Sequence, residues 1–219
     1  MIKYFIKTPW WLKKIYPKRI WSIDTVENNI YLTFDDGPHP VATAFVLDEL
    51  KKYDAKATFF CIGKNVENYP AVYDRIIAEG HQTGNHTQNH LNGWNTADEV
   101  YLNDVRLAAR NIQSTLFRPP YGRIRSRQAR RLNEYKIVMW DVLSGDFDLT
   151  ITKEACLQNV LRNTSPGSVV VFHDSEKALD KLRYSLPLVL EHFSQKEYKF
   201  LPIPLLKKGS PLIKKLGPG

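Results

Sequence analysis

Short apolar runs alternate with amphipathic helical segments between residues 30 and 201, and this alternation constrains the fold more than any other feature. We expect strands at Ile30–Phe34, Ala57–Cys61, His81–Gly84, Leu116–Arg118, Ile137–Trp140, Ser168–Phe172 and Tyr198–Leu201. We expect helices at Val41–Tyr53, Pro70–Glu79, Thr96–Thr115, Ser126–Tyr135, Thr152–Asn163 and Asp180–Gln195. Strands that alternate with helices form parallel sheets, because each helix returns the chain to the edge where the next strand begins.

The predicted fold class is therefore α/β, with about seven parallel strands. A closed or nearly closed (β/α) barrel and an open doubly wound sheet both fit this pattern, and in both the ligand site lies at the carboxyl ends of the strands. Three helix details are expected as well: a capping box formed by Thr96 and Glu99, an N-cap at Thr152, and an interruption at Pro187.

The composition is that of one soluble globular domain with a basic surface. The chain has 219 residues, of which 43% are hydrophobic, and carries a net charge of +8. A positive balance favours an anionic partner such as a cell-wall polymer or a membrane surface. No nucleic-acid motif accompanies it, so no nucleic-acid partner is expected. Cys61 and Cys156 are too few for a disulfide framework, and we expect buried thiols.

The two ends of the chain differ in composition from the part between them. Residues 1–27 form a basic and aromatic segment, residues 28–205 the predicted catalytic domain, and residues 206–219 a basic tail. The first segment lacks the long apolar stretch and the cleavage site of a signal peptide, and no run approaches the ~20 apolar residues of a membrane span. We expect it to pack on the domain, with contact to an anionic membrane surface as the alternative. The compartment stays open: cytoplasmic or peripherally membrane-associated, unless another route exports the protein.

Two adjacent carboxylates, Asp35 and Asp36, end the first predicted strand and are followed at once by Gly37-Pro38. Two carboxylates at the end of a buried strand repel each other and resist desolvation, so they need a metal ion or a cationic partner to stay ionised. A polar strand end before a turn is the alternative interpretation.

His86 and His90 follow the third predicted strand at a spacing of four residues. In a helical turn, this spacing projects both imidazoles from one face. A catalytic zinc site uses three protein ligands and keeps one position open. Asp35 or Asp36 can supply the third ligand, and the other aspartate can then act as general base.

Three further polar residues follow predicted strands. Arg118 can keep the base ionised through a charge-assisted hydrogen bond. His173 is either a hydrogen-bonded core residue or a general acid that faces the metal. Asp146 or Asp174 can orient this histidine and raise its pKa.

Three motifs together resemble those of the NodB-type polysaccharide deacetylases, carbohydrate esterase family 4. They are Thr33–Pro38, His86–His90 and Arg118–Gly122, and weaker fourth and fifth motifs lie at Trp140–Phe147 and Val171–His173. The resemblance spans about residues 30–201 and implies a distorted (β/α) barrel of about seven strands.

The resemblance also implies a metal-dependent removal of N-acetyl groups from an N-acetylglucosamine-containing polysaccharide, either peptidoglycan or a chitin-like oligosaccharide. We expect the protein to be a monomer. It places a divalent metal, usually zinc and alternatively cobalt, on Asp36, His86 and His90. It assigns Asp35 as the base, Arg118 as the residue that holds the base, and His173 as the acid. It further implies that Asp146 tunes His173 and that the backbone N–H of Tyr121 stabilises the oxyanion.

The substrate pocket that the resemblance implies is formed by Pro119, Tyr121, Trp140, Phe147 and Val171. Two of these depart from the family pattern, which usually has Trp at position 147 and Leu at position 171. Both replacements are apolar, so a pocket for an acetyl methyl group is retained with a different shape. A same-fold hydrolase of another amide or of an O-acetyl ester is the alternative, and a non-catalytic glycan-binding protein is a third reading. His39 is expected to be a loop residue.

Overall fold

A curved parallel sheet organises the computed structural model, which describes residues 4–205. The described strands are β1 (Asn29–Asp35), β2 (Thr58–Cys61), β3 (Gln82–Asn85), β4 (Leu116–Phe117), β5 (Lys136–Ile137), β6 (Val142–Leu143), β7 (Val169–His173) and β8 (Lys199–Phe200). Their order is β5-β4-β3-β2-β1-β7-β6, all neighbours are parallel, and β8 pairs with the start of β1. The predicted parallel sheet is confirmed. The bounds of the strand expected at Ile137–Trp140 differ: β5 ends at Ile137, and a separate strand, β6, begins at Val142.

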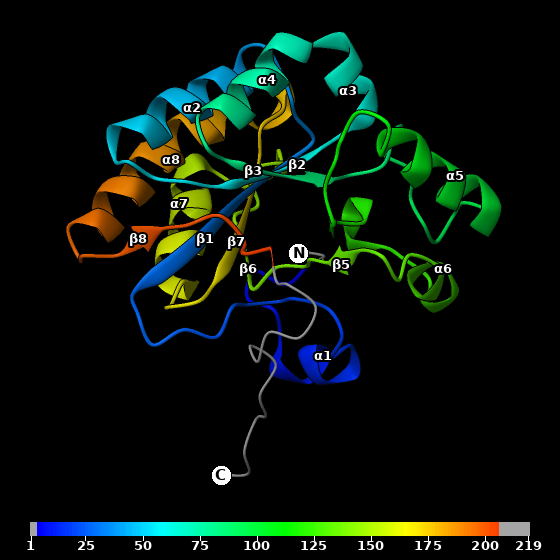
Figure 1. Cartoon of the computed structure of the whole chain (residues 1–219). Helices are drawn as coiled ribbons and strands as arrows, with labels where there is room; N and C mark the ends of the chain where they lie inside the picture. The colour runs from blue at the N-terminus through cyan, green and yellow to red at the C-terminus, as the bar shows by residue number, and fades with distance from the viewer. Residues whose placement is uncertain (1–3, 206–219) are drawn as a thin grey trace.

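The helices pack around the outside of this sheet, as Figure 1 shows. They are α1 (Trp10–Ile15), α2 (Ala42–Lys52), α3 (Gly63–Asn68), α4 (Pro70–Ala78), α5 (Asp98–Ala108), α6 (Ser126–Arg131), α7 (Lys153–Asn163) and α8 (Leu179–Ser194), with short 3-10 turns η1 (Pro120–Gly122) and η2 (Glu176–Ala178). Neighbouring helices contact one another in the pairs α7–α8, α8–α2, α2–α4, α3–α5 and α5–α6.

The alternation of side chains along β1 distinguishes a barrel from an open doubly wound sheet, the two architectures that the sequence allows. On β1, Leu32 and Phe34 belong to the core that the surrounding helices cover. Tyr31 belongs to a second core, where it meets Phe60 and Val169 from other strands and no helix contributes. Because successive side chains of a strand point to opposite faces, the inner face of the sheet is packed by strand side chains and by flanking residues such as Ile23 and Ile203, without a helix. The sheet is therefore a distorted half-barrel and not an open doubly wound sheet.

The N-terminal segment is hydrogen-bonded to both ends of the curved sheet. Leu143 of β6 donates its N–H to Ile6, and Lys7 bridges Val142 in antiparallel orientation. Ile20 pairs with Val138, next to β5. Exposed strand edges invite unwanted pairing, so this segment covers edges that the barrel leaves open. The predicted tail, residues 206–219, lies outside the described residues.

Three helix details differ from the sequence prediction. The capping box is wrong: α5 begins after Ala97, the hydroxyl of Thr96 donates to Asn92, and Glu99 pairs with Arg131. Helix α8 runs through Pro187, because leucines on both sides of the proline pack into the same core. Helix α3 was not expected. The N-cap at Thr152 is confirmed by its hydrogen bond from Ala155. Among residues 4–205, we find no helix with the length and apolar character of a membrane span.

Candidate active site

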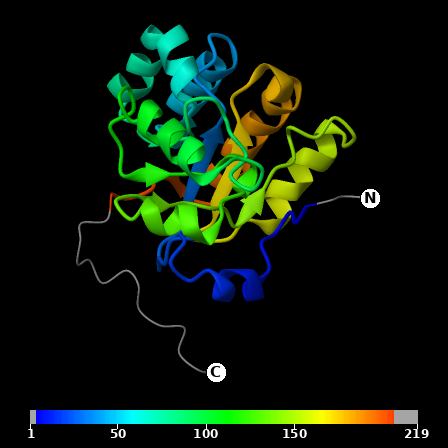
Figure 2. The ribbon, with the colours of Figure 1, turned by 90° about the vertical axis from the view of Figure 1, so that its right-hand side faces the viewer.

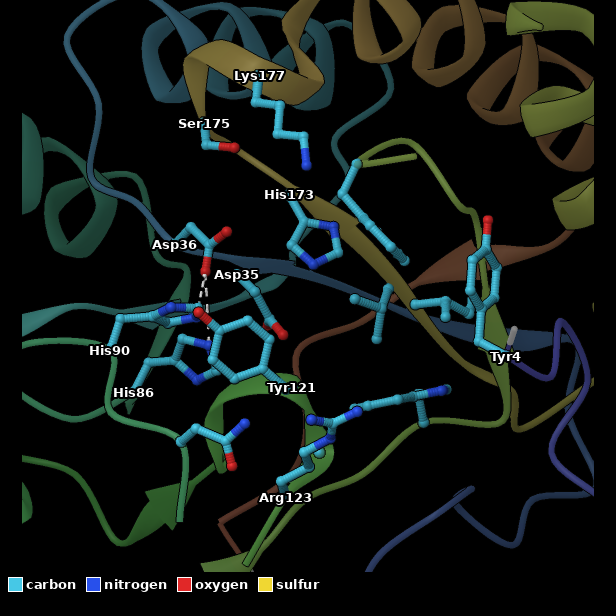
Figure 3. Close-up of a pocket in the computed structure, with 16 residues that line it drawn as sticks. Tyr4, Asp35, Asp36, His86, His90, Tyr121, Arg123, His173, Ser175 and Lys177 are labelled. Atoms are coloured by element: carbon cyan, nitrogen blue, oxygen red, sulfur yellow. Dashed lines mark ion pairs between the residues drawn. The ribbon is translucent and has the colours of Figure 1, made fainter. Parts of the chain in front are cut away.

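A cavity of about 570 Å³ opens at the carboxyl ends of the strands (Figure 3). It is lined by Tyr4, Asp35, Asp36, His86, His90, Asn92, Tyr121, Gly122, Arg123, Trp140, Leu143, Phe147, Val171, His173, Ser175 and Lys177. These residues come from β1, β6, β7 and their flanks, from the loop after β3, from η1 and η2 and their flanks, and from the N-terminal segment. The topology thus brings distant polar residues of the sequence to one place.

Asp36, His86 and His90 form a cluster with the donor set of a metal site. Asp36 Oδ1 lies 3.1 Å from His90 Nε2 and 3.6 Å from His86 Nε2, and the ligand atoms all lie within 4.8 Å of one another. Asp36 Oδ1 is buried and makes no hydrogen bond of acceptable geometry within residues 4–205. A buried carboxylate oxygen without a hydrogen bond is costly. Two imidazoles and one carboxylate around it fit a divalent cation such as Zn²⁺.

The protonation of these groups suits metal binding. Burial lowers the pKa of His86 to about 4, so this imidazole is neutral at neutral pH. Its Nδ1 lies 2.7 Å from the carbonyl oxygen of Arg118, which accepts a hydrogen bond from the Nδ1–H and leaves the unprotonated Nε2 to face the cluster. Burial alone would raise the pKa of Asp36, but the contact with His90 and the positive charge on His173 outweigh burial and lower that pKa.

The loop that carries the two histidines is not a helical turn, so that part of the sequence prediction is wrong. Residues 86–90 are irregular, and Thr87 and His90 have φ angles of 66° and 55°. The buried carboxylate of Asp104, on α5, accepts hydrogen bonds from the backbone N–H groups of Gln88 and Asn89. The two histidines converge because hydrogen bonds to Asp104 fix the shape of this loop, and not because of helical periodicity.

Strained backbone is concentrated at this site. Asp36 and Tyr121 also have positive φ angles, 79° and 59°. Non-glycine residues adopt this region only at a cost of order 1–3 kcal/mol each, and they persist where the surrounding structure over-determines them. Gly37 is required for a steric reason, because an added Cβ would lie 2.1 Å from a carboxylate oxygen of Asp174.

Asp35 and Arg118 form a buried ion pair beside the cluster. Arg118 Nη1 donates to Asp35 Oδ1 at 2.7 Å, and the arginine side chain is fully buried. Its remaining nitrogens donate to the carbonyls of Val138 and Met139, and its guanidinium lies 4.1 Å from the Phe60 ring centroid. We find no hydrogen bond to Asp35 Oδ2 among the described residues. This geometry fits the predicted pairing and leaves one oxygen of Asp35 available at the cavity.

His173 lies across the cavity and is oriented by Asp146. His173 Nδ1 donates to Asp146 Oδ1 at 2.7 Å, and the backbone N–H of His173 donates to Asp146 Oδ2 at the same distance. Burial alone would lower the pKa of His173, but the charge and hydrogen bond of Asp146, together with Asp36 and Asp35, raise it to about 10. A protonated imidazole held in this way can donate a proton from Nε2.

Asp174, the alternative partner that the sequence left open, has another role in the structure. It accepts hydrogen bonds from the N–H of Gly37 and the hydroxyl of Thr43, and its own N–H donates to the carbonyl of Asp35. Asp174 therefore fixes the turn that presents the two aspartates. Burial raises its pKa to about 7.

The predicted pocket residues are brought together with one exception. Tyr121, Trp140, Phe147 and Val171 line the cavity, and the Phe147 ring lies 5.1 Å from the ring of His173. Pro119 is buried and is not among the lining residues. The ring of Tyr121 lies 4.6 Å from that of His90, and the predicted oxyanion role of its backbone N–H stays a prediction.

Sequence reasoning missed several residues of the site. Tyr4 reaches the cavity from the N-terminal segment, where its ring packs on Phe147 and its hydroxyl donates to Asp148. No local pattern could have placed it there. Asp104 had a signal: it lies three residues after the buried Tyr101, on the apolar face of α5, where a charge needs a partner. His39 is a loop residue as expected, and its Nδ1 accepts from the N–H of Ala42 at the start of α2.

Known proteins are similar to this chain in both sequence and fold. A family model described as polysaccharide deacetylase matches residues 22–140. A peptidoglycan-N-acetylglucosamine deacetylase of Bacillus cereus is 33% identical over 191 residues, covering 84% of this chain and 90% of the relative. A chitooligosaccharide deacetylase of Azorhizobium caulinodans is 32% identical over 157 residues, covering 68% and 74% of the two chains. The crystal structure of the Bc1960 peptidoglycan N-acetylglucosamine deacetylase superposes with a TM-score of 0.80 at 30% identity, over 93% of this chain and 98% of that one.

Proposed function

Because the chain belongs to the polysaccharide deacetylase family, we propose that it hydrolyses N-acetyl groups of an N-acetylglucosamine-containing polymer, either peptidoglycan or a chitin-like oligosaccharide. The relatives named for these two substrates support the substrate class. The observation that carries the proposal is one cavity with three kinds of group. The metal-ligand cluster, a carboxylate held by Arg118 and an imidazole held by Asp146 all line it.

The proposed cofactor is Zn²⁺, with Co²⁺ as the alternative. Asp36, His86 and His90 would hold it, and the buried oxygen of Asp36 that lacks a hydrogen bond supports this assignment. When bound, such a cation supplies Lewis-acid polarisation of the acetamide carbonyl and makes water more acidic.

The chain's own residues supply the two proton transfers. Asp35 takes a proton from the attacking water on the oxygen that Arg118 leaves free, while Arg118 keeps the carboxylate in place. His173 donates its Nε2 proton to the nitrogen that leaves, and Asp146 holds the ring in the required tautomer. The products are acetate and a free amino sugar. The backbone N–H of Tyr121 is the proposed additional donor to the oxyanion.

The apolar side of the cavity is suited to an acetyl methyl group. Trp140, Phe147 and Val171 line it, and Phe147 packs against the proposed acid. Because Phe147 and Val171 depart from the usual family residues, the same machinery acting on an O-acetyl ester or another amide is the second candidate. The proposed active form is a monomer.

The proposal is tested by measuring acetate release from N-acetylated chitooligosaccharides, peptidoglycan and O-acetylated glycans. Each substrate is assayed with added zinc, added cobalt or a chelator. We expect turnover of an N-acetylated glycan that the chelator abolishes and zinc or cobalt restores. Asp35→Asn should retain the metal and lose about 10²–10⁴-fold in kcat, the usual contribution of a general base.

Each other outcome has a definite meaning. Turnover of O-acetylated glycans alone would select the second candidate. Glycan binding without turnover in any metal state would contradict catalysis and support a binding protein. An Asp35→Asn variant as active as wild type would refute the assignment of the base.

A further inference from the structure

Four large apolar side chains are exposed close together near the N-terminus. Phe5, Trp10, Trp11 and Ile15 are 55%, 68%, 45% and 58% exposed, and we call these four residues the aromatic platform. The rings of Phe5 and Trp11 meet edge to face at 6.3 Å, so the two parts of the segment form one surface. Contiguous exposed apolar surface usually marks an interaction site. Nothing in the proposed reaction uses this surface.

Helix α1 is held so that the platform faces outward. Leu12 and Tyr16 pack on the core cluster that contains Trp21 and Met139, and Lys13 pairs with the buried Asp141 at 2.6 Å. Helix α1 has six residues, and a helix this short is not stable in isolation. These inward contacts therefore fix its orientation, while its largest apolar side chains remain in solvent.

The charge around the platform favours an anionic partner. Residues 1–23 contain no aspartate or glutamate. Lys14 and Lys18 are exposed, and Lys14 Nζ lies 4.8 Å from the centroid of the Trp10 ring. Tryptophans flanked by lysines are typical of side chains at the interface between lipid headgroups and acyl chains. The outward side chains include no carboxylate or amide for sugar hydroxyls, so the surface fits lipid better than glycan.

The N-terminal segment that carries the platform runs along β6, and its first part reaches the cavity. Residues 4–8 run antiparallel to β6, with Thr8 bonded to Asp141 before the strand and Tyr4 bonded to Asp148 after it. Tyr4 lines the cavity and Phe5 follows it directly, whereas the other three platform residues lie on α1, beyond Thr8. Figures 1 and 2 both show α1 at one end of the molecule, apart from the other helices.

We propose that the aromatic platform docks on an anionic lipid surface. Its tryptophans and Ile15 enter the headgroup region, and Lys14 and Lys18 contact lipid phosphates. This surface is independent of the proposed reaction, so either proposal can fail alone.

The test is sedimentation of the full chain with vesicles of phosphatidylcholine, with and without an equal amount of phosphatidylglycerol. We expect binding to the mixed vesicles and a blue shift of tryptophan emission. The double variant Trp10→Ser with Trp11→Ser should lose at least about tenfold in partitioning. Lys14→Gln with Lys18→Gln should lose about fivefold per lysine and respond less to salt.

Two controls separate the platform from general effects. Leu149→Ser removes an exposed apolar side chain outside the platform, after β6, and should bind vesicles like wild type. A full chain with glutamine at Lys207, Lys208, Lys214 and Lys215 should keep most of its binding. Thermal unfolding and hydrolysis of a soluble substrate should be unchanged in the platform variants, which shows that they fold.

Five results would overturn the proposal. Wild type could fail to bind anionic vesicles, or the tryptophan variants could bind as well as wild type. Binding could depend on the tail lysines and not on the platform, or wild type could form a dimer that the tryptophan variants abolish. Platform-dependent binding to insoluble peptidoglycan without binding to vesicles would also overturn it, in favour of a glycan surface.

Discussion

Asp35 and Asp141 are both buried carboxylates held by cations, yet they lie at opposite ends of the sheet. Asp35 ends β1, bonds Arg118 through one oxygen and faces the cavity with the other. Asp141 precedes β6, and both of its oxygens are occupied, by Lys7, Lys13 and the hydroxyl of Ser168. A buried ion pair therefore does not by itself mark a reactive carboxylate. The oxygen left free beside a ligand cluster does.

The largest effect on catalysis is expected at the cluster next to Asp35. Asp36→Ala removes a ligand and should lower zinc affinity by more than about 100-fold, because even the outer partners of metal ligands contribute 10–100-fold. Activity at limiting zinc should fall at least as far. Metal titration followed by calorimetry measures the first effect, and Asp141→Ala is the matched control. Unchanged zinc affinity in Asp36→Ala would contradict the proposed difference between the ligand cluster and Asp141.

The two sets of cations should differ in their effect on stability. Arg118→Met leaves Asp35 buried and uncompensated and should lower the free energy of unfolding by about 3–5 kcal/mol. Lys13→Met leaves Asp141 with Lys7 and Ser168 and should cost about 1 kcal/mol or less, because Lys13 is partly exposed. Denaturant unfolding monitored by circular dichroism measures both. Equal losses of unfolding free energy in the two variants would show that the number of partners bonded to the carboxylate does not matter.

A smaller effect on catalysis is expected at the acid side of the cavity. Asp146→Asn removes the negative charge that raises the pKa of His173. That pKa therefore falls, and His173 loses its proton at a lower pH than in wild type. The alkaline limb of the pH–kcat profile should move to lower pH, and kcat should fall about 10–100-fold. Asp148→Asn, which removes the partner of Tyr4, should leave that limb in place. A limb that does not move would assign it to another group.

The smallest effect on catalysis is expected at Asp141. Burial alone would raise its pKa, but Lys13, Lys7 and Ser168 outweigh burial and lower it. The stabilisation is therefore present above the unfolded-state pKa of about 3.9 and is lost as the pH falls through the folded-state value. Asp141→Asn should be about 1–2 kcal/mol less stable than wild type at pH 7, with the difference shrinking below about pH 4 and kcat within about twofold. Urea unfolding across this pH range checks it, and a loss of kcat would contradict the structural role.

Much of the fold could be predicted from the sequence, because its strands are short, apolar and separated by helices. The strands around Ile30, Ala57 and Ser168 lie where expected, and the family that the motifs indicated is confirmed. The short edge strands β5 and β6 could not be predicted as two separate strands, because a strand of two residues is too short to show an alternating pattern. Helix α3 was missed for a similar reason, as its six residues include only one large buried apolar side chain, Val66.

The candidate site could be predicted in its residue types but not in its connections. The sequence allowed Asp146 or Asp174 to orient His173, and only the structure shows Asp146 in contact with the imidazole. The helical turn predicted for the histidine pair was wrong, because the loop is shaped by Asp104 from a helix that follows it. A partner that lies distant in sequence and close in space leaves no local pattern.

By itself, the sequence determined that two carboxylates, two histidines, an arginine and a third histidine lie at the ends of parallel strands. It did so because strand ends in an alternating α/β chain share one edge. Only the tertiary structure decided which oxygen of Asp35 is free, why Asp141 is an anchor, and how the N-terminal segment brings Tyr4 to the cavity while leaving Trp10 and Trp11 exposed. Hydrophobic periodicity is encoded locally, whereas the saturation of a polar group depends on contacts that only the folded chain creates.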